Sequence, residues 1–184
     1  MLRRRSLSRF GRSTTAHHSE EALVDAIKLL ERQHREVEQL FRKIENADTD
    51  EKERLFDELA DALAVHAAIE ERHFYPATKG ARTAELLQEA VEEHLSMKRL
   101  IADLLEMEPG EAQFDSKVSV LREQVEHHVE EEEGELFPKV RRKHSKQELE
   151  DMGVLMEQTA EELKKQGAPR MEVPKETGAA APLE

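Results

Sequence analysis

The sequence predicts an all-α fold: an antiparallel up-down four-helix bundle made of two repeated helical hairpins, with a fifth helix near the C-terminus. Three observations predict it. Charged residues make up 38% of the 184 residues and aromatic residues only 4%, and Trp is absent, a balance typical of amphipathic helices rather than sheets. Apolar residues recur every three or four positions along four stretches, and a motif in the first half returns in the second.

The length suits one domain with a tail at each end. We expect residues 1–18 to form a basic flexible arm, 19–145 the bundle, 146–166 the additional C-terminal helix, and 167–184 a disordered tail rich in Pro, Gly and Ala. The arm lacks the apolar segment of a secretory signal, so a solvated arm is expected. An organelle-type address and a docking arm for an acidic partner are the alternatives.

The first predicted hairpin joins two helices whose core-facing positions form stripes. Ser19 is a candidate N-cap of the first helix, and its stripe is Leu23, Ile27, Leu30, His34, Val37, Phe41 and Ile44. The polar stretch 46–50 ends this helix. The second stripe, which we expect to end at Pro76, is Leu55, Leu59, Ala62, His66, Glu70 and His73.

The second predicted hairpin follows the same plan. Thr83 can cap the third helix, whose stripe is Leu87, Ala90, His94, Met97, Ile101 and Leu104. A Pro-Gly pair at 109–110 ends it. The fourth stripe, expected to stop before Pro138, is Val118, Leu121, Val125, His128, Glu132 and Leu136. Ser145 and Glu148 make a capping box that opens the fifth helix.

An internal repeat relates the two hairpins. The stretch LAVHAAIEERHFYP at 63–76 returns in altered form as VEHHVEEEEGELFP at 125–138, and each copy has a His and a Glu four residues apart. Residues at i and i+4 share one face of a helix. Aligning His34 with His94 extends the repeat to the first and third helices.

Each stripe carries a His, and two also carry a Glu, in positions that a bundle normally fills with apolar residues. A buried polar group without a partner costs roughly 1–3 kcal/mol, so several at one depth indicate a metal centre. Because Cys is absent, the ligands must be nitrogen and oxygen, which suits iron, manganese or zinc. Two carboxylates able to bridge favour a pair of ions, and we expect di-iron. Six ligand residues leave positions for oxygen, peroxide, nitric oxide or water.

The motifs HREVEQLF at 34, HAAIEERHFYP at 66, VEEHLSMKRL around His94 and HVEEEEGELFP at 128 resemble those of the hemerythrin-like (HHE cation-binding) family over residues 25–142. The resemblance implies a four-helix bundle with two iron ions, bridged by carboxylates and by an oxo or hydroxo group. It implies that the ligands are His34, His66, Glu70, His94, His128 and Glu132, with Glu70 and Glu132 as bridges.

Two departures from the oxygen-carrying members of that family concern the ligand set. Those members have HxxxH on the third helix, where this chain has Lys98 after His94, and they end with HxxxxD where this chain has HxxxE. One imidazole is therefore missing. His73 and, at the equivalent offset in the second half, Glu135 are candidates to replace it, the alternative for His73 being a supporting or partly exposed role.

Other polar residues near the motifs have less direct roles. His127 with Glu132 would give a HxxxxE spacing, but the repeat favours His128 and places His127 on the helix flank. Glu71 and Glu133 are candidate partners for the N–H groups of the ligand imidazoles. Tyr75, the only Tyr, is expected to pack near the end of the site.

We therefore expect a cytoplasmic di-iron protein that binds oxygen or a related small oxidant for sensing, storage or defence. The alternatives are a peroxide- or nitric-oxide-consuming oxidoreductase, an iron-handling protein whose tails engage a partner, and a zinc or metal-free structural bundle. Outside the first 12 residues the chain has 23 basic and 41 acidic side chains, and this negative charge repels nucleic acid. No apolar run is long enough for a transmembrane segment.

Overall fold

The computed structural model describes residues 24–111 and 113–183, and its regular elements there are all helical, which confirms the predicted fold class. The α-helices are α1 (Ala26–Asn46), α2 (Thr49–Ile69), α3 (Tyr75–Thr78), α4 (Ala84–Leu105), α5 (Phe114–Glu131), α6 (Phe137–Lys143) and α7 (Lys146–Gln166). Two π-helical turns, η1 (Glu70–Phe74) and η2 (Glu132–Leu136), follow α2 and α5, and a 3-10 helix, η3 (Pro169–Glu176), follows α7. Among these residues, none of the helices could cross a membrane.

The first hairpin begins later than the sequence predicts. Val24 and Asp25 are not helical, and the Asp25 side chain caps α1 by accepting a hydrogen bond of 3.0 Å from the backbone N–H of Lys28. Asp48 caps α2 in the same way. The predicted cap Ser19 and the stripe residue Leu23 lie outside the described residues.

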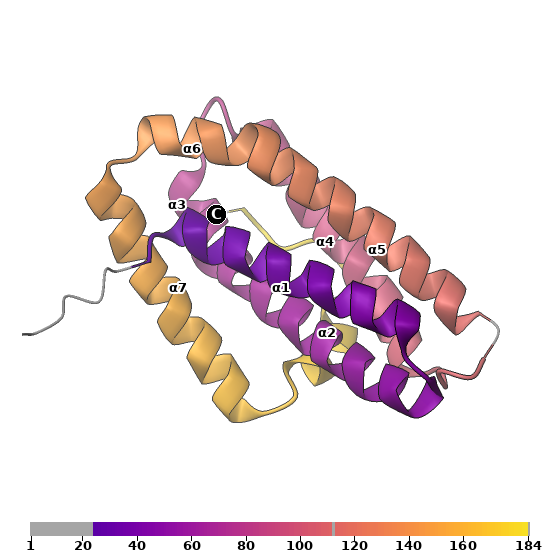
Figure 1. The fold of residues 1–184 in the computed structure, drawn as a ribbon. Coiled ribbons are helices and arrows are strands. Elements are labelled where there is room, and N and C mark those ends of the chain that lie inside the picture. The colour runs from indigo at the N-terminus through magenta and orange to yellow at the C-terminus, as the bar shows by residue number, and fades with distance from the viewer. Residues whose placement is uncertain (1–23, 112, 184) are drawn as a thin grey trace, which may run out of the picture.

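The two hairpins lie side by side, α1 packed on α2 and α4 on α5 (Figure 1). Their stripes form two apolar cores. One core lies toward α3, α6 and α7 and contains Leu30, Ile69 and Leu87, and the other lies toward the opposite ends of the helices and contains Phe41 and Ile101. The polar layer described below separates them.

Both helices that carry the repeated motif continue through their prolines instead of ending there. The backbone N–H of Tyr75 donates to the carbonyl of Glu70, five residues back, and that of Phe137 donates to Glu132. The next residue is Pro76 or Pro138, which has no N–H for an α-helical bond. A widened π-helical turn accommodates this loss, and the chain then continues into α3 or α6.

The fifth helix, α7, forms as predicted, and its capping box between Ser145 and Glu148 is present. It packs against α1 and α2 (Figure 1). Gly153 permits this close approach, because a Cβ built there would lie 2.2 Å from the carbonyl oxygen of Val24.

The prediction of a disordered tail at 167–184 is wrong for the part that η3 occupies. Val173 is only 2% exposed, and the Arg170 guanidinium pairs with Asp57 at 2.5 Å and Asp61 at 2.6 Å on α2. η3 packs against both α2 and α4. Composition suggested disorder, but one apolar anchor and a doubly paired Arg hold the segment on the bundle.

Replacing Gly153 with Ala tests the docking of α7. We expect the free energy of unfolding to fall by about 1–3 kcal/mol, because the added methyl group forces α7 away from the start of α1. This loss outweighs the gain of about 1 kcal/mol in helix propensity. Chemical denaturation measures it, with Gly178→Ala as the control, since a Cβ there meets no atom within 4 Å. Equal stability of Gly153→Ala and the parent would contradict the close contact.

Candidate metal centre

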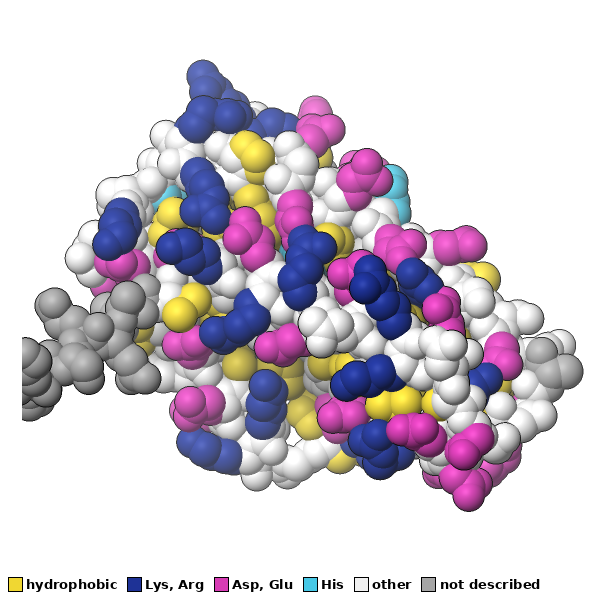
Figure 2. All heavy atoms as spheres, viewed as in Figure 1, with side chains coloured by type: hydrophobic (Ala, Val, Ile, Leu, Met, Phe, Trp, Pro, Cys, Tyr) yellow, Lys and Arg dark blue, Asp and Glu magenta, His cyan; other side chains and the backbone are white. Residues whose placement is uncertain are grey.

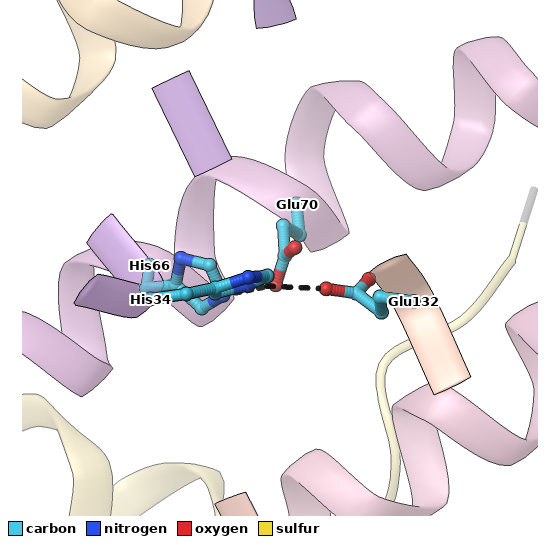
Figure 3. Close-up of side chains that lie close together, drawn as sticks. All are labelled: His34, His66, Glu70 and Glu132. Carbon is cyan, nitrogen blue, oxygen red and sulfur yellow. Dashed lines mark ion pairs between the residues drawn. The ribbon is translucent and has the colours of Figure 1, made fainter. Parts of the chain in front are cut away.

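Six polar side chains meet in one buried layer of the bundle. His34 comes from α1, His66 from α2 and Glu70 from η1, while the second hairpin contributes His94, His128 and Glu132 from α4, α5 and η2. None is more than 5% exposed. Figure 3 shows the imidazoles of His34 and His66 directed toward the carboxylates of Glu70 and Glu132.

The donor atoms fall into two groups that share one residue. One group consists of His34, His66, Glu70 and Glu132, and the other of Glu70, His94 and His128, with the atoms of each group within 4.8 Å of one another. The Nε2 atoms of His66 and His94 lie 3.2 and 3.3 Å from the same oxygen, Oε2 of Glu70. Glu70 therefore lies between the two groups, where a bridging ligand would be.

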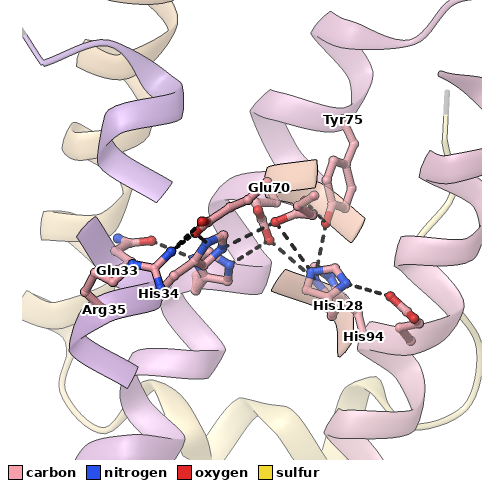
Figure 4. Close-up of polar contacts among 11 residues, drawn as sticks. Gln33, His34, Arg35, Glu70, Tyr75, His94 and His128 are labelled. Carbon is pink, nitrogen blue, oxygen red and sulfur yellow. Dashed lines mark hydrogen bonds and ion pairs between the residues drawn. The ribbon is translucent and has the colours of Figure 1, made fainter. Parts of the chain in front are cut away.

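In the first group, each imidazole is oriented by a bond at its other ring nitrogen. Nδ1 of His34 lies 2.8 Å from Oε1 of Glu133, whose carboxylate also contacts Arg35, and Nδ1 of His66 lies 2.8 Å from Oε1 of Gln33 (Figure 4). Carboxylate and amide oxygens only accept hydrogen bonds, so each Nδ1 carries the proton and each Nε2 presents a lone pair to the centre.

The second group repeats this arrangement. Nδ1 of His94 donates to Glu71 at 2.9 Å and Nδ1 of His128 donates to Glu93 at 2.7 Å. The carboxylate of Glu71 also accepts bonds of 2.8 and 3.0 Å from the amine of Lys98. The Nε2 atoms of His94 and His128 then face each other at 3.2 Å, and two imidazole lone pairs so close require a positive charge between them.

Several buried atoms of this layer have no hydrogen-bond partner among the described residues. They are Nε2 of His34, Nε2 of His66, both carboxylate oxygens of Glu70, and Oε2 of Glu132. Buried polar atoms are nearly always paired, and unpaired ones cost roughly 1–3 kcal/mol each. All these atoms are lone-pair donors, so a bound cation satisfies them together and a neutral core does not.

The hydroxyl of Tyr75 completes the layer on the carboxylate side. It donates to Oε1 of Glu132 at 3.0 Å and lies 3.3 Å from Nε2 of His94. The π-helical turn causes this, because five residues rather than four now separate Glu70 from the next inward position. In the second half the same turn places Phe137 inward, where its ring stacks on His34 with a centroid separation of 5.9 Å.

A cavity of ≈ 30 Å³ adjoins the layer. Its walls are the four imidazoles, the side chain of Lys98, and seven apolar side chains: Val37, Leu63, Ala67, Met97, Ile101, Val125 and Val129. Neither Glu70 nor Glu132 lines it. The cavity therefore reaches the imidazoles through an apolar space, and it is large enough to hold at least one water molecule.

Comparison with known proteins agrees with this geometry. The model of the hemerythrin HHE cation binding domain matches residues 25–140, which is more than half of the chain. The chain belongs to the hemerythrin HHE cation-binding family. The crystal structure of the hemerythrin HHE cation binding domain-containing protein from Mycobacterium kansasii, a Rv2633c homolog, superposes with a TM-score of 0.69 at 27% identity, covering 83% of this chain and 99% of that one.

Two curated relatives are also similar to this HHE domain. The uncharacterized protein Rv2633c of Mycobacterium tuberculosis is 30% identical over 144 residues, which are 77% of this chain and 88% of that protein. A protein named DNA nickase from a Nostoc species is 29% identical over 118 residues, 64% of this chain. The match spans only 34% of the length of the DNA nickase.

The structure of this HHE domain places two predicted candidates away from the layer. His73 turns toward α7, where its Nε2 lies 2.8 Å from Oγ1 of Thr159. Glu135 is 64% exposed at its side chain and pairs with Lys139 at 3.1 Å. Neither residue joins the donor groups of the layer, because the π-helical turns rotate residues after Glu70 and Glu132 out of the phase of an α-helix.

Neighbouring positions divide between the layer and the surface. His128 is 2% exposed, whereas the side chain of His127 is 61% exposed, so the register favoured by the repeat is the one observed. Glu71 and Glu133 bind imidazole N–H groups, as expected. Tyr75 contacts the site instead of only packing beside it.

The sequence did not reveal the acceptors Gln33 and Glu93. Each directly precedes a buried His, in α1 and in α4, and the two positions coincide in the repeat. Alignment of the two halves could therefore have identified both residues as candidate acceptors. Lys98 was noted only for the missing imidazole, and its bonds to Glu71 depend on helix packing that the sequence does not show.

The buried charges of the HHE site shift the pKa values of its residues. Burial, and then the charge of Glu132, raise the pKa of Glu70 well above its usual value. Burial opposes ionisation of Glu132 too, but the charges of His128 and the other imidazoles lower its pKa below the usual range. Burial lowers the pKa of His66 and, with Glu132, raises that of Tyr75. One carboxyl therefore keeps a proton more readily than the other.

Glu70→Gln tests this charge balance in the metal-free protein. A raised folded-state pKa means that ionised Glu70 destabilises the fold, and that this penalty is relieved as pH falls through that pKa toward the value of about 4.5 in the unfolded chain. We expect Glu70→Gln to raise the free energy of unfolding at pH 7 by about 1–2 kcal/mol, since its amide also donates to the imidazole lone pairs. The gain should shrink as pH falls.

Urea unfolding between pH 5 and pH 8 measures the effect. Glu135→Gln is the control, because it removes the charge of a carboxylate that is 64% exposed and lies three residues after Glu132, the counterpart of Glu70. A Glu70→Gln protein that is less stable than the parent at pH 7 without metal would show that Glu70 is not destabilising.

Proposed function

We propose that this HHE domain is a non-haem di-iron protein that binds oxygen or a related small oxidant, such as peroxide or nitric oxide, for sensing, storage or defence. One observation carries the proposal: six buried donors converge beside a cavity of ≈ 30 Å³ that is lined by all four imidazoles. The donors supply a metal site, and the cavity limits the size of what reaches it.

The donor set fits two ions. Ligand atoms bound at about 2.1 Å to one ion lie roughly 3 Å apart, and the imidazole nitrogens lie 3.2 to 3.7 Å from the carboxylate oxygens of Glu70 and Glu132. Glu70 belongs to both groups of donors. Paired carboxylates and imidazoles from facing helices of a bundle are the ligands of di-iron proteins, and mixed nitrogen and oxygen ligation suits iron.

Iron held there would supply a redox couple and exchangeable coordination positions. The residues of the chain do the rest. The four bonds at Nδ1 hold the imidazoles in the tautomer that presents Nε2 to the centre. The raised pKa of Tyr75, caused by burial and by Glu132, keeps its phenol protonated and donating to that carboxylate. The apolar wall of the cavity excludes water and charged ligands.

The cavity sets the class of ligand. A cavity of ≈ 30 Å³ is above the roughly 10–15 Å³ needed to hold one water molecule, so it suits a diatomic molecule or peroxide better than an organic substrate. The apolar lining favours neutral molecules because a charged one would lose its hydration without compensation. Oxygen, nitric oxide and hydrogen peroxide meet both conditions.

An enzyme that consumes peroxide or nitric oxide is the second candidate, and Lys98 favours it. Lys98 occupies the place of the additional imidazole in oxygen-carrying relatives, and its amine is bound by Glu71 and Glu176 at 2.8 Å each. The amine of Lys98 therefore does not act as a metal ligand. One more coordination position of the iron would then be open to an exchangeable ligand. Tyr75 provides a hydroxyl group within 3.3 Å of an imidazole of the site.

We propose that nucleic acid is not a substrate of this protein. The match to the DNA nickase covers about a third of that protein. Outside the first 12 residues, acidic side chains outnumber basic ones by 41 to 23, which opposes the binding of phosphates.

Removing single ligands tests the metal assignment. We expect His66→Ala and His128→Ala to bind far less iron than the parent, with a loss of affinity larger than the 10- to 100-fold typical of changes around the ligands. Metal analysis of purified protein and titration of the metal-free form measure this. His127→Ala is the matched control, since it removes the exposed neighbour of His128. Unchanged stoichiometry in His128→Ala would contradict the assignment.

Rapid mixing of the reduced, iron-loaded protein with oxygen and with hydrogen peroxide separates the two candidate functions. A visible absorbance band that forms under air and disappears under argon is expected for reversible binding. Multiple turnovers of peroxide without loss of iron would instead support the enzyme. An iron-loaded protein that responds to neither oxygen, nitric oxide nor peroxide would contradict both.

A further inference from the structure

The two hairpins meet along two seams that the internal repeat makes equivalent. The repeat pairs α1 with α4 through His34 and His94, and α2 with α5 through His66 and His128. The seam between α2 and α4 is therefore the counterpart of the seam between α1 and α5. We call them the sealed seam and the open seam, because the described part of the chain covers only the first.

The C-terminal segment closes the sealed seam. η3 packs on both α2 and α4, with Val173 buried between them. Glu176 pairs with Lys98 at 2.8 Å, and the carbonyl of Thr177 accepts a bond of 3.0 Å from Arg99. Further along, Lys79 donates to the carbonyl of Leu183. The segment thus covers the wall of the cavity that contains Lys98.

The open seam is hollow where the sealed one is filled. α1 and α5 pack against each other far less extensively than the two helices of either hairpin, and a groove of ≈ 520 Å³ runs between them. Figure 1 shows these two helices apart in this view, and Figure 2 shows the same face covered mainly by charged side chains with small hydrophobic areas among them. The groove is lined by His34, Arg35, Val37, Glu38, Phe41, Val125, Glu126, Val129, Glu130, Glu133 and Gly134.

The groove and the site cavity share one wall. His34, Val37, Val125 and Val129 line both. Three of the four are Val, so a neutral molecule crosses without displacing a hydrogen-bonded group, whereas an ion would lose hydration. Val37 and Val125 are buried, but Val129 is half-buried at the side of α5. Val129 is therefore the least buried of the three Val side chains in the shared wall.

We propose that the open seam is the entrance through which a small neutral ligand reaches the cavity, and that Val129 is the side chain that sets the rate of entry. This inference rests on the proposed function of the site for its biological meaning. The passage itself follows from the shared wall of the groove and the cavity, and from the C-terminal segment that covers the equivalent seam.

The single Tyr provides a metal-free test. The chain has no Trp, so its intrinsic fluorescence comes from Tyr75, whose ring lies against His94 at a centroid separation of 5.6 Å, and His94 is a wall of the cavity. Collisional quenching of Tyr75 by dissolved oxygen then measures entry. We expect Val129→Phe to lower the quenching constant roughly fivefold, the factor that a rotamer strain of about 1 kcal/mol imposes on a rate, and Val129→Ala to raise it.

Ala67→Val is the matched control, because Ala67 is the counterpart of Val129 at the sealed seam and also lines the cavity. We expect it to leave the quenching constant close to that of the parent. If Ala67→Val lowered the quenching constant as much as Val129→Phe does, the proposal would be overturned, because the volume of the cavity and not the open seam would then control the entry of oxygen. Unchanged quenching in both Val129 variants, with parent-like circular dichroism, would also overturn it.

The rate of nitric oxide binding to the iron-loaded protein provides a second measurement. We expect nitric oxide to bind faster to Val129→Ala than to the parent, and more slowly to Val129→Phe than to the parent. The iron content should be equal in all three proteins. The two measurements distinguish the two proposals. If the entrance exists but the protein does not bind iron, the order of the quenching constants among the variants is still observed. If the protein binds iron but ligands enter elsewhere, the rates of nitric oxide binding are equal among the variants.

Discussion

Four hydrogen bonds, made by the Nδ1 atoms of the buried imidazoles, fix the orientation and the tautomer of these rings at the centre of the bundle. Two run within hairpins, from His66 to Gln33 and from His128 to Glu93, and two run between hairpins, from His34 to Glu133 and from His94 to Glu71. Each leaves an Nε2 lone pair facing inward. Together the four bonds leave a layer of buried lone pairs that a bound cation would satisfy.

The π-helical turns explain how one repeated motif supplies both the inward donor residues and the side chains around them. Each begins at an inward Glu and ends before an aromatic residue followed by Pro. The extra residue in the turn brings Tyr75 or Phe137 against an imidazole and turns His73 away. The repeat thus becomes asymmetric at one atom: a hydroxyl group contacts a carboxylate in one half, and an apolar ring covers an imidazole in the other.

A second asymmetry comes from outside the repeat. The C-terminal segment lies on the seam between α2 and α4, whereas the seam between α1 and α5 is lined by a groove among the described residues. Lys98 and Glu38 hold equivalent positions in the two halves, and only Lys98 is paired with the C-terminal segment. The layer of donor residues is nearly two-fold symmetric, but its surroundings therefore differ between the two seams.

Much of the fold and of the site could be predicted from the sequence because both depend on periodicity. Four stripes with three- and four-residue spacing predicted the helices, and a His in each stripe identified the side chains that share one layer. The positions of His73 and Tyr75 could not be predicted, since a π-helical turn changes the phase of every residue that follows it. The ordered segment around Val173 was missed because composition reports the tendency to fold alone and not the affinity for a finished surface.

The sequence by itself determined the helical class, the repeat, and the set of nitrogen and oxygen donors, because each depends on residue type and spacing along one helix. Only the tertiary structure decided which acceptors orient the imidazoles, which seam the C-terminal segment covers, and where the cavity opens. These depend on contacts between residues far apart in the chain, such as His34 with Glu133 and Lys98 with Glu176. Local periodicity carries no information about such pairs.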